Sequence, residues 1–251
     1  MEEKKSLGKK IFFLYPHSVI QDELISTLIQ HEFEVYFLKD HTKAYNLLKK
    51  FGNSICFINI DETLAQPEWE TYIKKLQSDP EIKGVQIGIL SYNNDRELIK
   101  KYLMEIRIKC GFIQLKLGVA ESTKIILKTL EANEAKGRRK FVRANCENDS
   151  RVTFNVKYNG DLYSGNIIDI SSIGMACSFD SDPDVKKNSL LREIQLKLRG
   201  TLIGIDGIVI GKRDTTPKTY VLIFDSKTDA IAKAKIRKFI NAALQRYIDS
   251  V

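Results

Sequence analysis

Two short groups of polar residues in the second half of the chain carry side chains suited to binding an anion. The first group holds three arginines, Arg138, Arg139 and Arg143. The second has the pattern Asp-x-Ser-x-x-Gly and consists of Asp169, Ser171 and Gly174. Guanidinium groups are planar, permanently charged and forked, so they pair bidentately with phosphate oxygens, and lysine does not replace them. These residue types predict the binding of a charged ligand.

The second group is expected to lie on a strand that presents its polar residues outward. Asp169 and Ser171 are two residues apart and share one face of a strand, whereas Ile168 and Ile170 point to the other face. We therefore expect the polar pair outside and the isoleucines in a core. Gly174 follows the strand, where a glycine permits positive φ or a close approach of the backbone to a ligand.

The chain around these groups has the pattern of a small antiparallel β-barrel followed by one helix. Six strand-like segments are separated by turn signals, and the strongest of these is Asn159-Gly160, because that dipeptide favours a tight hairpin between alternating strands. The segments are residues 152–158, 162–170, 175–179, 194–198, 202–210 and 220–224. Six short antiparallel strands predict a closed barrel, which leaves no long edge exposed. Apolar residues at helical spacing predict a final helix over 229–247.

The first half has a different pattern, in which strand-length apolar runs alternate with amphipathic stretches. The predicted strands are residues 11–15, 34–38, 55–60, 86–90 and 112–115. The predicted helices lie within residues 21–30, 43–50, 70–77, 95–104 and 121–136. Five such units in succession predict an α/β fold, a doubly wound parallel five-stranded sheet with helices on both faces. Gly137 is placed to end the last helix.

Two domains are expected from this change of pattern. The first covers residues 1–136, and the second covers residues 137–251, with residues 137–150 as a linker. Residues 1–137 hold 20 Lys and Arg against 19 Asp and Glu, whereas residues 138–251 hold 20 against 13. A basic second half favours an anionic partner, which could be nucleic acid, membrane headgroups or a phosphorylated small molecule.

Composition excludes several classes of protein. The chain has no run of about 18 apolar residues, so we expect a cytoplasmic protein with no membrane insertion. Its four cysteines form no C-x-x-C pair, and its three histidines lack a matching set of ligands. Neither a disulfide framework nor a metal site is therefore predicted.

The two polar groups, their order and their barrel context resemble the PilZ family over residues 138–250. The resemblance implies a receptor for the bacterial second messenger cyclic di-GMP, with no cofactor beyond that ligand. Arg139 and Arg143 match the two arginines of the family's R-x-x-x-R motif, and residues 169–174 match its Asp-x-Ser-x-x-Gly motif. Arg138 precedes the first motif, and in the family an arginine there accompanies the binding of an intercalated pair of ligand molecules.

The resemblance also implies how the ligand is held. Arginine forks can pair with its phosphates or with guanine O6 and N7, and they can stack on the base. Asp169 can accept hydrogen bonds from the N1–H and N2–H₂ edge of guanine, and Ser171 adds a hydroxyl. The implied mechanism is a clamp, in which the segment from Arg138 to Arg143 folds over a ligand on the outer surface of the barrel. Ordering of this segment is expected to reorient the first domain and change its partner contacts.

The first domain resembles the receiver domain of two-component signalling. In that family the phosphorylated aspartate ends the third strand, and acidic residues after the first strand hold magnesium. Here Asn59 stands at the best-matching acceptor position, and residues 14–18 contain no carboxylate. Ser91 and Lys116 match other family positions, and Asp61 is the alternative acceptor if the register shifts by two residues. Because magnesium needs such carboxylates, a module that contacts a protein partner is expected rather than a phosphorylated one.

Two alternatives to a cyclic di-GMP receptor stay open. One is a PilZ-fold adaptor that acts through protein contacts and binds no nucleotide. The other is a response regulator whose basic domain binds nucleic acid, although the sequence shows no helix-turn-helix pattern and no stripe of stacking aromatics, so nucleic acid is not the expected partner. An enzyme is the least supported class, because we find no Ser/His/Asp set, no phosphate-binding glycine loop and no paired acids.

Overall fold

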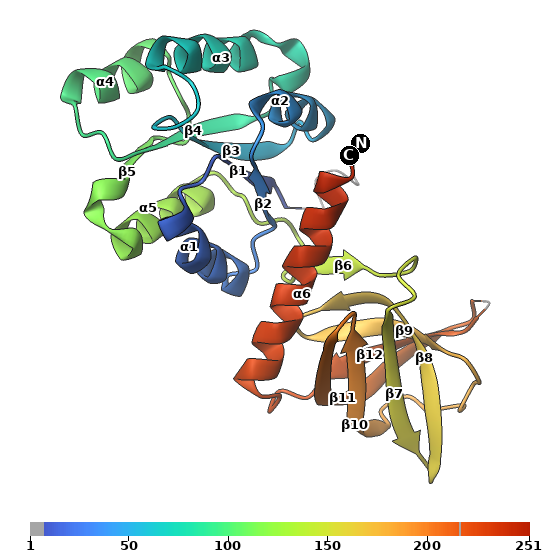
Figure 1. Cartoon of the computed structure of the whole chain (residues 1–251). Helices are drawn as coiled ribbons and strands as arrows, with labels where there is room; N and C mark the ends of the chain where they lie inside the picture. Colours follow the sequence, from blue (N-terminus) through green and yellow to red (C-terminus); the bar gives the residue numbers. More distant parts are fainter. Residues whose placement is uncertain (1–7, 216) are drawn as a thin grey trace. The chain divides into compact units, whose positions relative to one another are not determined.

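The computed structural model describes residues 8–215 and 217–251. The described chain divides into two compact units (Figure 1). One comprises the residues up to Lys140 together with Tyr247–Val251, and the other comprises Phe141–Arg246. Within the described residues, no helix is both long and apolar enough to cross a bilayer.

The first unit is built on a parallel sheet of five strands. The strands are β1 (Lys10–Leu14), β2 (Val35–Leu38), β3 (Ser54–Asn59), β4 (Gln86–Ser91) and β5 (Phe112–Gln114). Their order in the sheet is β2-β1-β3-β4-β5, so the order reverses between β1 and β3. All six residues of β3 are buried, as expected for a central strand covered on both faces.

Helices cover both faces of this sheet. They are α1 (Ser18–Gln30), α2 (His41–Lys50), α3 (Gln66–Ser78), α4 (Arg96–Lys100) with its π-helical extension η3 (Lys101–Glu105), and α5 (Val119–Ala132), with short turns η2 (Pro80–Ile82) and η4 (Leu115–Leu117). Leu24 and Leu28 of α1 share one core with Ile126 and Leu130 of α5. The helices α2, α3 and α4 lie on the opposite face (Figure 1). The predicted doubly wound fold is therefore confirmed.

The end of α5 differs from the prediction. The helix stops at Ala132, five residues before Gly137, and Glu134 adopts positive φ (49°). The amide of Ala135 donates to Leu130 O (3.0 Å) and that of Glu134 donates to Glu131 O (3.0 Å), which is a Schellman ending with a glutamate in the position that usually favours glycine. Ala135 is buried, which stabilises this ending. The prediction that Gly137 ends the helix was therefore wrong.

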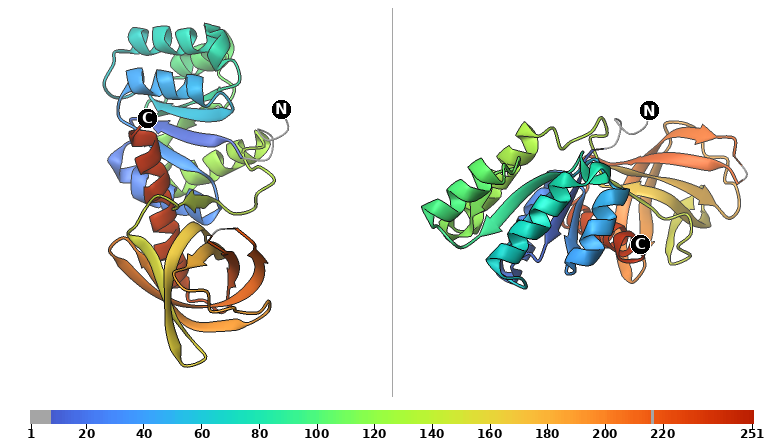
Figure 2. Two further views of the ribbon diagram at one scale, coloured as in Figure 1. Left: turned by 90° about the vertical axis from the view of Figure 1, so that its right-hand side faces the viewer. Right: turned by 90° about the horizontal axis from the view of Figure 1, so that it is seen from above.

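The second unit is an antiparallel barrel. Its strands are β6 (Arg143–Asn145), β7 (Val152–Tyr158), β8 (Asp161–Ser171), β9 (Gly174–Phe179), β10 (Leu190–Leu198), β11 (Thr201–Arg213) and β12 (Thr219–Phe224), and the helix α6 (Ala230–Asp249) follows. Six of the strands close on themselves in the order β8-β7-β10-β11-β12-β9, because β9 also pairs with β8. Figure 2 shows these strands curving into a continuous wall. The predicted six-stranded barrel is confirmed, and β6 is an additional strand paired with β8.

Alternation of apolar and polar residues produces the core of the barrel. In β7, Val152, Phe154 and Val156 are buried, and the intervening residues are not. The ring of Phe179 contacts those of Phe154 and Tyr220 edge-on, with centroids 5.0 Å apart in both cases. The predicted hairpin joins β7 to β8, and both Asn159 (φ 52°) and Gly160 (φ 94°) have the positive φ of a type I′ turn.

The loop after β9 is tied to β12 by a single carboxylate. Asp182 accepts hydrogen bonds from Lys218 Nζ (2.6 Å) and from the hydroxyl of Tyr220, whose ring lies in the core. The bonds from Lys218 and Tyr220 hold the pKa of the Asp182 carboxyl well below its usual range. A carboxyl whose folded-state pKa is lowered stabilises the fold above its unfolded pKa, and this stability is lost as the pH falls towards the folded value.

Replacing Asp182 with asparagine should therefore destabilise the barrel at pH 7 and much less at pH 3. We expect a decrease of about 1 kcal/mol in the free energy of unfolding at neutral pH, a modest value because the carboxylate is about one-third exposed. Urea unfolding of both proteins at the two pH values measures it, with Asp214→Asn as the control for loss of an exposed carboxylate. An equal difference at pH 3 and pH 7 would contradict the charge-based explanation.

Candidate functional site

Strand pairing between β6 and β8 brings the two predicted motifs together. Arg143 lies opposite Ser171, and Asn145 lies opposite Asp169. The Arg143 guanidinium reaches diagonally to Asp169, with Nη1 3.2 Å from Oδ1. The two side chains are 51% and 33% exposed, so this is an open surface ion pair of small net stability. A ligand with stronger hydrogen-bonding groups can therefore compete for both partners.

A β-bulge in β8 decides which way Asp169 points. The register against β9 shifts between Ile167, which pairs with Cys177, and Asp169, which pairs with Ala176. Because one residue is inserted, the alternation of faces is reset at this point. Ile167 and Ile170 are both fully buried, whereas Ile168 is only half-buried. The prediction was thus right for Ile170 and wrong for Ile168, which a strict period of two had placed in the core.

The sequence predicted a surface hydroxyl on Ser171 beside Asp169. The structure contradicts this prediction. The side chain of Ser171 is buried at 3% exposure, and its Oγ donates to the carbonyl oxygen of Gly174 at 3.1 Å. This hydrogen bond spans the turn between β8 and β9, where Ser171 and Gly174 form the last pair of the ladder. The role that the structure gives Ser171 is to fix the turn beside Asp169.

Gly174 is required by packing within the barrel. Of the two roles expected for this glycine, positive φ is not the one observed, because its φ is not among the positive values. A Cβ at this position would lie 2.3 Å from Leu222 O and 3.3 Å from the Cα of Ile223. Such an approach is much closer than van der Waals contact, so only glycine lets β9 pair with β12 here.

Arg138 and Arg139 belong to the first compact unit. Both are exposed, and both lie in the irregular segment between α5 and β6. Strand pairing therefore brings Arg143, Asp169 and Gly174 together on the barrel, whereas no strand pairing positions Arg138 or Arg139.

A row of cross-strand neighbours on the outer face of the barrel runs from two isoleucines to Arg143. Ile208, Ile223 and Gly174 are successive cross-strand partners on β11, β12 and β9, and the row continues through Ser171 to Arg143. Ile223 is 41% exposed although it is apolar. The sequence carried a signal for this surface, because Tyr220, Leu222 and Phe224 fill the inward positions of β12 and leave apolar residues between them facing outward. That signal was missed.

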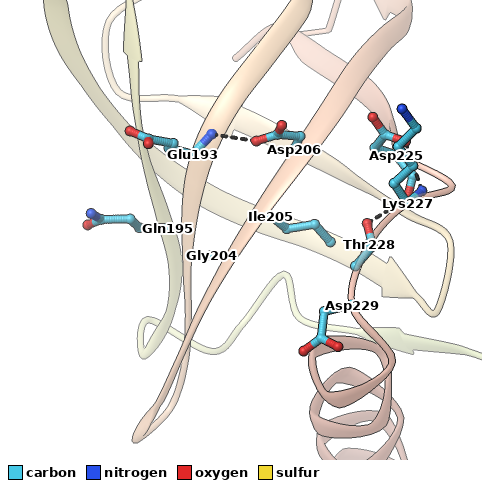
Figure 3. Close-up of a pocket in the computed structure, with 9 residues that line it drawn as sticks. All are labelled: Glu193, Gln195, Gly204, Ile205, Asp206, Asp225, Lys227, Thr228 and Asp229. Atoms are coloured by element: carbon cyan, nitrogen blue, oxygen red, sulfur yellow. Dashed lines mark hydrogen bonds between the residues drawn. The ribbon is translucent and has the colours of Figure 1, made fainter.

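A pocket elsewhere on the barrel has the wrong charge for an anion. Figure 3 shows Glu193, Asp206, Asp225 and Asp229 around it, against one lysine, Lys227. The amide of Glu193 donates to Asp206 Oδ1 at 2.7 Å, so Asp206 mainly supports the local backbone. The pocket contains none of the predicted site residues. The acidic side chains of this pocket therefore disfavour an anionic ligand there.

Comparison with protein families decides the nature of the second unit. The model of the PilZ domain matches residues 137–242, which span both polar motifs and the complete barrel. These residues are a PilZ domain. The match covers less than half of the chain, and a search of curated proteins found no relative.

Solved structures resemble each half of the chain. The PilZ domain of YcgR from Escherichia coli, solved with c-di-GMP, is 12% identical with a TM-score of 0.39, and the match covers 45% of this chain and 95% of that one. MrkH of K. pneumonia in complex with c-di-GMP is 20% identical with a TM-score of 0.39, over 47% and 57% of the two chains. The receiver domain of an HD domain-containing protein from Pseudomonas fluorescens is 19% identical with a TM-score of 0.41, over 50% and 89%.

The receiver-like unit differs from a phosphate acceptor in how its polar residues are used. Asn59, at the end of β3, is buried, and its Nδ2 donates to Tyr15 O at 2.8 Å. Asp61 accepts from Ser91 Oγ (2.5 Å) and from the amide of Tyr92 (2.6 Å), so each carboxylate oxygen already holds a donor. Lys116 donates to Asn94 instead of to Asp61. Across the described residues, no group of three or more histidine, cysteine or acidic side chains could hold a metal ion. That this unit is not phosphorylated stays a prediction.

Proposed function

We propose that this protein is a non-enzymatic receptor for cyclic di-GMP, with residues 137–251 as the binding domain and residues 1–136 as the responding domain. The observation that carries the proposal is the Arg143–Asp169 pair on the outer face of a PilZ domain, at 3.2 Å and open to solvent. Strand register alone positions this pair, so it does not depend on the ligand for its formation. It combines a forked cation for phosphate with an acceptor for the donor edge of guanine.

The two groups act on different parts of the ligand. Arg143 exchanges its single exposed bond to Asp169 for two parallel charge-assisted bonds to the oxygens of a phosphate, and this bidentate geometry makes the new pair the stronger one. Asp169 is then released to accept from N1–H and N2–H₂ of guanine. The apolar side chain of Ile223 lies on β12, two strands from β8, and offers an outward-facing surface for the base. Arg139, and Arg138 beside it, supply further guanidinium groups from the preceding segment.

Isothermal titration of the full-length protein with cyclic di-GMP tests the proposal. We expect binding at micromolar ligand or tighter, and at least about tenfold weaker binding of cyclic di-AMP, because adenine lacks the N1–H and N2–H₂ donors that Asp169 accepts. Failure to bind cyclic di-GMP in a folded protein would leave a PilZ-fold adaptor as the better description.

The proposal extends to ordering of the segment between the units. Arg138, Arg139 and Lys140 are exposed cleavage sites for trypsin in irregular backbone. If cyclic di-GMP engages these arginines, cleavage there should slow by about tenfold at a ligand concentration ten times Kd, because only the ligand-free fraction is cut. Mass spectrometry of the fragments measures the rate at this segment. An Arg143→Ala protein is the control and should show no protection, and unchanged cleavage in the wild-type protein would reject the ordering step.

Ordering of this segment is the route by which we propose that the ligand changes the contacts of the receiver-like unit with a protein partner. The free energy for that change comes from the difference in ligand affinity between the ordered and disordered segment.

A further inference from the structure

Three arginines from distant parts of the chain interact electrostatically within the second unit, outside the residues considered so far. Arg151 stands directly before β7, Arg199 lies in the turn between β10 and β11, and Arg246 lies near the end of α6. The amide of Arg199 donates to Arg151 O at 2.9 Å, which fixes the turn against the start of β7. We call Arg151, Arg199 and Arg246 the arginine cluster.

A single carboxylate serves this cluster. Asp149 Oδ2 accepts from Arg199 Nε at 2.5 Å, and Asp149 Oδ1 lies 3.4 Å from Arg151 Nε. Burial opposes ionisation of Asp149, but its bonds to Arg199 and to the amide of Arg151 outweigh this effect and lower the pKa of the carboxyl. One negative charge is therefore set against three positive charges, and the cluster keeps an excess of two.

Arg246 is the member of the cluster whose guanidinium forms no ion pair among the described residues. Its side chain is only partly exposed, and within the described residues of the barrel unit it has no hydrogen-bond or ion-pair partner. Burial, followed by the like charge of Arg199, lowers the pKa of Arg246. A guanidinium remains charged in spite of such a shift, because arginine does not lose its proton in proteins. A partly buried guanidinium whose donors are not used by protein acceptors is suited to pairing with the oxygens of an anion.

We propose that the arginine cluster is a binding site for a phosphate group. Arg151 and Arg199 use only their Nε groups on Asp149, and among the described residues their Nη groups donate to no protein acceptor. Together with the fork of Arg246 they form a set of planar donors, which suits the several oxygens of a phosphate better than the two of a carboxylate.

The phosphate can come from two sources, which share this chemistry. Cys146 follows β6 three residues after Arg143, a distance of about 10 Å along an extended chain. The amide of Asp149 donates to Cys146 O at 2.9 Å, so the carboxylate bonded to Arg151 and Arg199 stands in the turn that directly follows β6. The source is thus either a phosphodiester of a bound cyclic dinucleotide or a separate phosphate ester. The cluster itself does not require the proposed function.

Thermal unfolding and titration calorimetry of the full-length protein with inorganic phosphate test the site, with chloride at equal ionic strength as the reference. Phosphate should raise the Tm of the wild-type protein more than chloride does. Arg246→Gln should weaken phosphate binding about tenfold or more, as expected for loss of charged hydrogen bonds. Lys238→Gln is the matched control, because it removes the same charge from an exposed position on α6 and should leave binding unchanged. Circular dichroism shows whether each variant is folded.

A titration of the same variants with cyclic di-GMP separates the sources. A tenfold loss of affinity in Arg246→Gln assigns the cluster to a phosphate of the dinucleotide, whereas wild-type affinity together with lost phosphate binding assigns it to a separate ester. The proposal is overturned if phosphate acts no more strongly than chloride and cyclic di-GMP affinity is unchanged, or if Arg246→Gln binds phosphate as the wild type does. If the wild-type protein binds no cyclic di-GMP, the proposed function fails and the phosphate titration still decides the cluster.

Discussion

Replacement of Arg143 by alanine should raise the Kd for cyclic di-GMP by about a hundredfold or more. Two charge-assisted hydrogen bonds from one guanidinium fork contribute about 1.5–3 kcal/mol each, and each 1.4 kcal/mol is a factor of ten in affinity. The loss is increased because Asp169 then keeps its negative charge on the surface without the cation that lies 3.2 Å away. Titration calorimetry at fixed ionic strength measures the change.

Two further variants show whether the effect depends on the fork. Arg143→Lys retains the charge but cannot form a bidentate pair, so it should recover only part of the affinity. Lys157→Ala removes an equal charge from an exposed position on β7 and should bind as the wild type does within about twofold. An Arg143→Ala protein that binds within threefold of the wild type would show that the Arg143–Asp169 surface is not the ligand site.

Substitution of Gly174 by alanine should lower the free energy of unfolding of the barrel by about 2–3 kcal/mol. The added Cβ would lie 2.3 Å from Leu222 O, which is backbone and cannot rotate away, so β9 and β12 must separate locally. The corresponding decrease in the midpoint of thermal unfolding is about 10 °C or more for a unit of this size. Calorimetry of the full-length protein, followed at the transition that belongs to the barrel, measures this change.

Gly204 provides the matched control for this substitution. It lies on β11 of the same barrel, and a Cβ there would meet nothing within 4 Å. Gly204→Ala should therefore be neutral or slightly stabilising, because alanine loses less conformational freedom on folding. If Gly174→Ala unfolds within 2 °C of Gly204→Ala, the close contact with Leu222 does not constrain the barrel.

The sequence predicted the strands whose residues alternate or form continuous apolar runs. The hairpin at Asn159 was predicted because a tight turn between twisted strands needs positive φ, and asparagine followed by glycine supplies it. The parallel sheet was predicted because short apolar runs alternate with amphipathic stretches, which is the pattern of successive βα units. These features depend on residues close together in the chain.

The features that were missed depend on pairing between distant residues. The strand β6 has three residues, and only Ala144 among them is buried, so it carries no periodic signal and exists because β8 offers it a partner. The bulge at Ile168 arises from the register between β8 and β9, and a count of two along the chain cannot reveal it. The need for glycine at position 174 was also missed, because it comes from the close approach of the backbone of β12, which is distant in the chain.

The additional strand β6 has a thermodynamic consequence. The six other strands complete a closed barrel, so β6 can detach from β8 without breaking any hydrogen bond of that barrel. Its opening free energy is therefore a local quantity, smaller than that of global unfolding, and only three residue pairs contribute to it. A ligand that binds Arg143 adds its binding energy directly to this local equilibrium. A ligand that binds Arg143 only while β6 is paired with β8 would therefore stabilise this short strand against local opening, and the closed barrel takes no part in that opening.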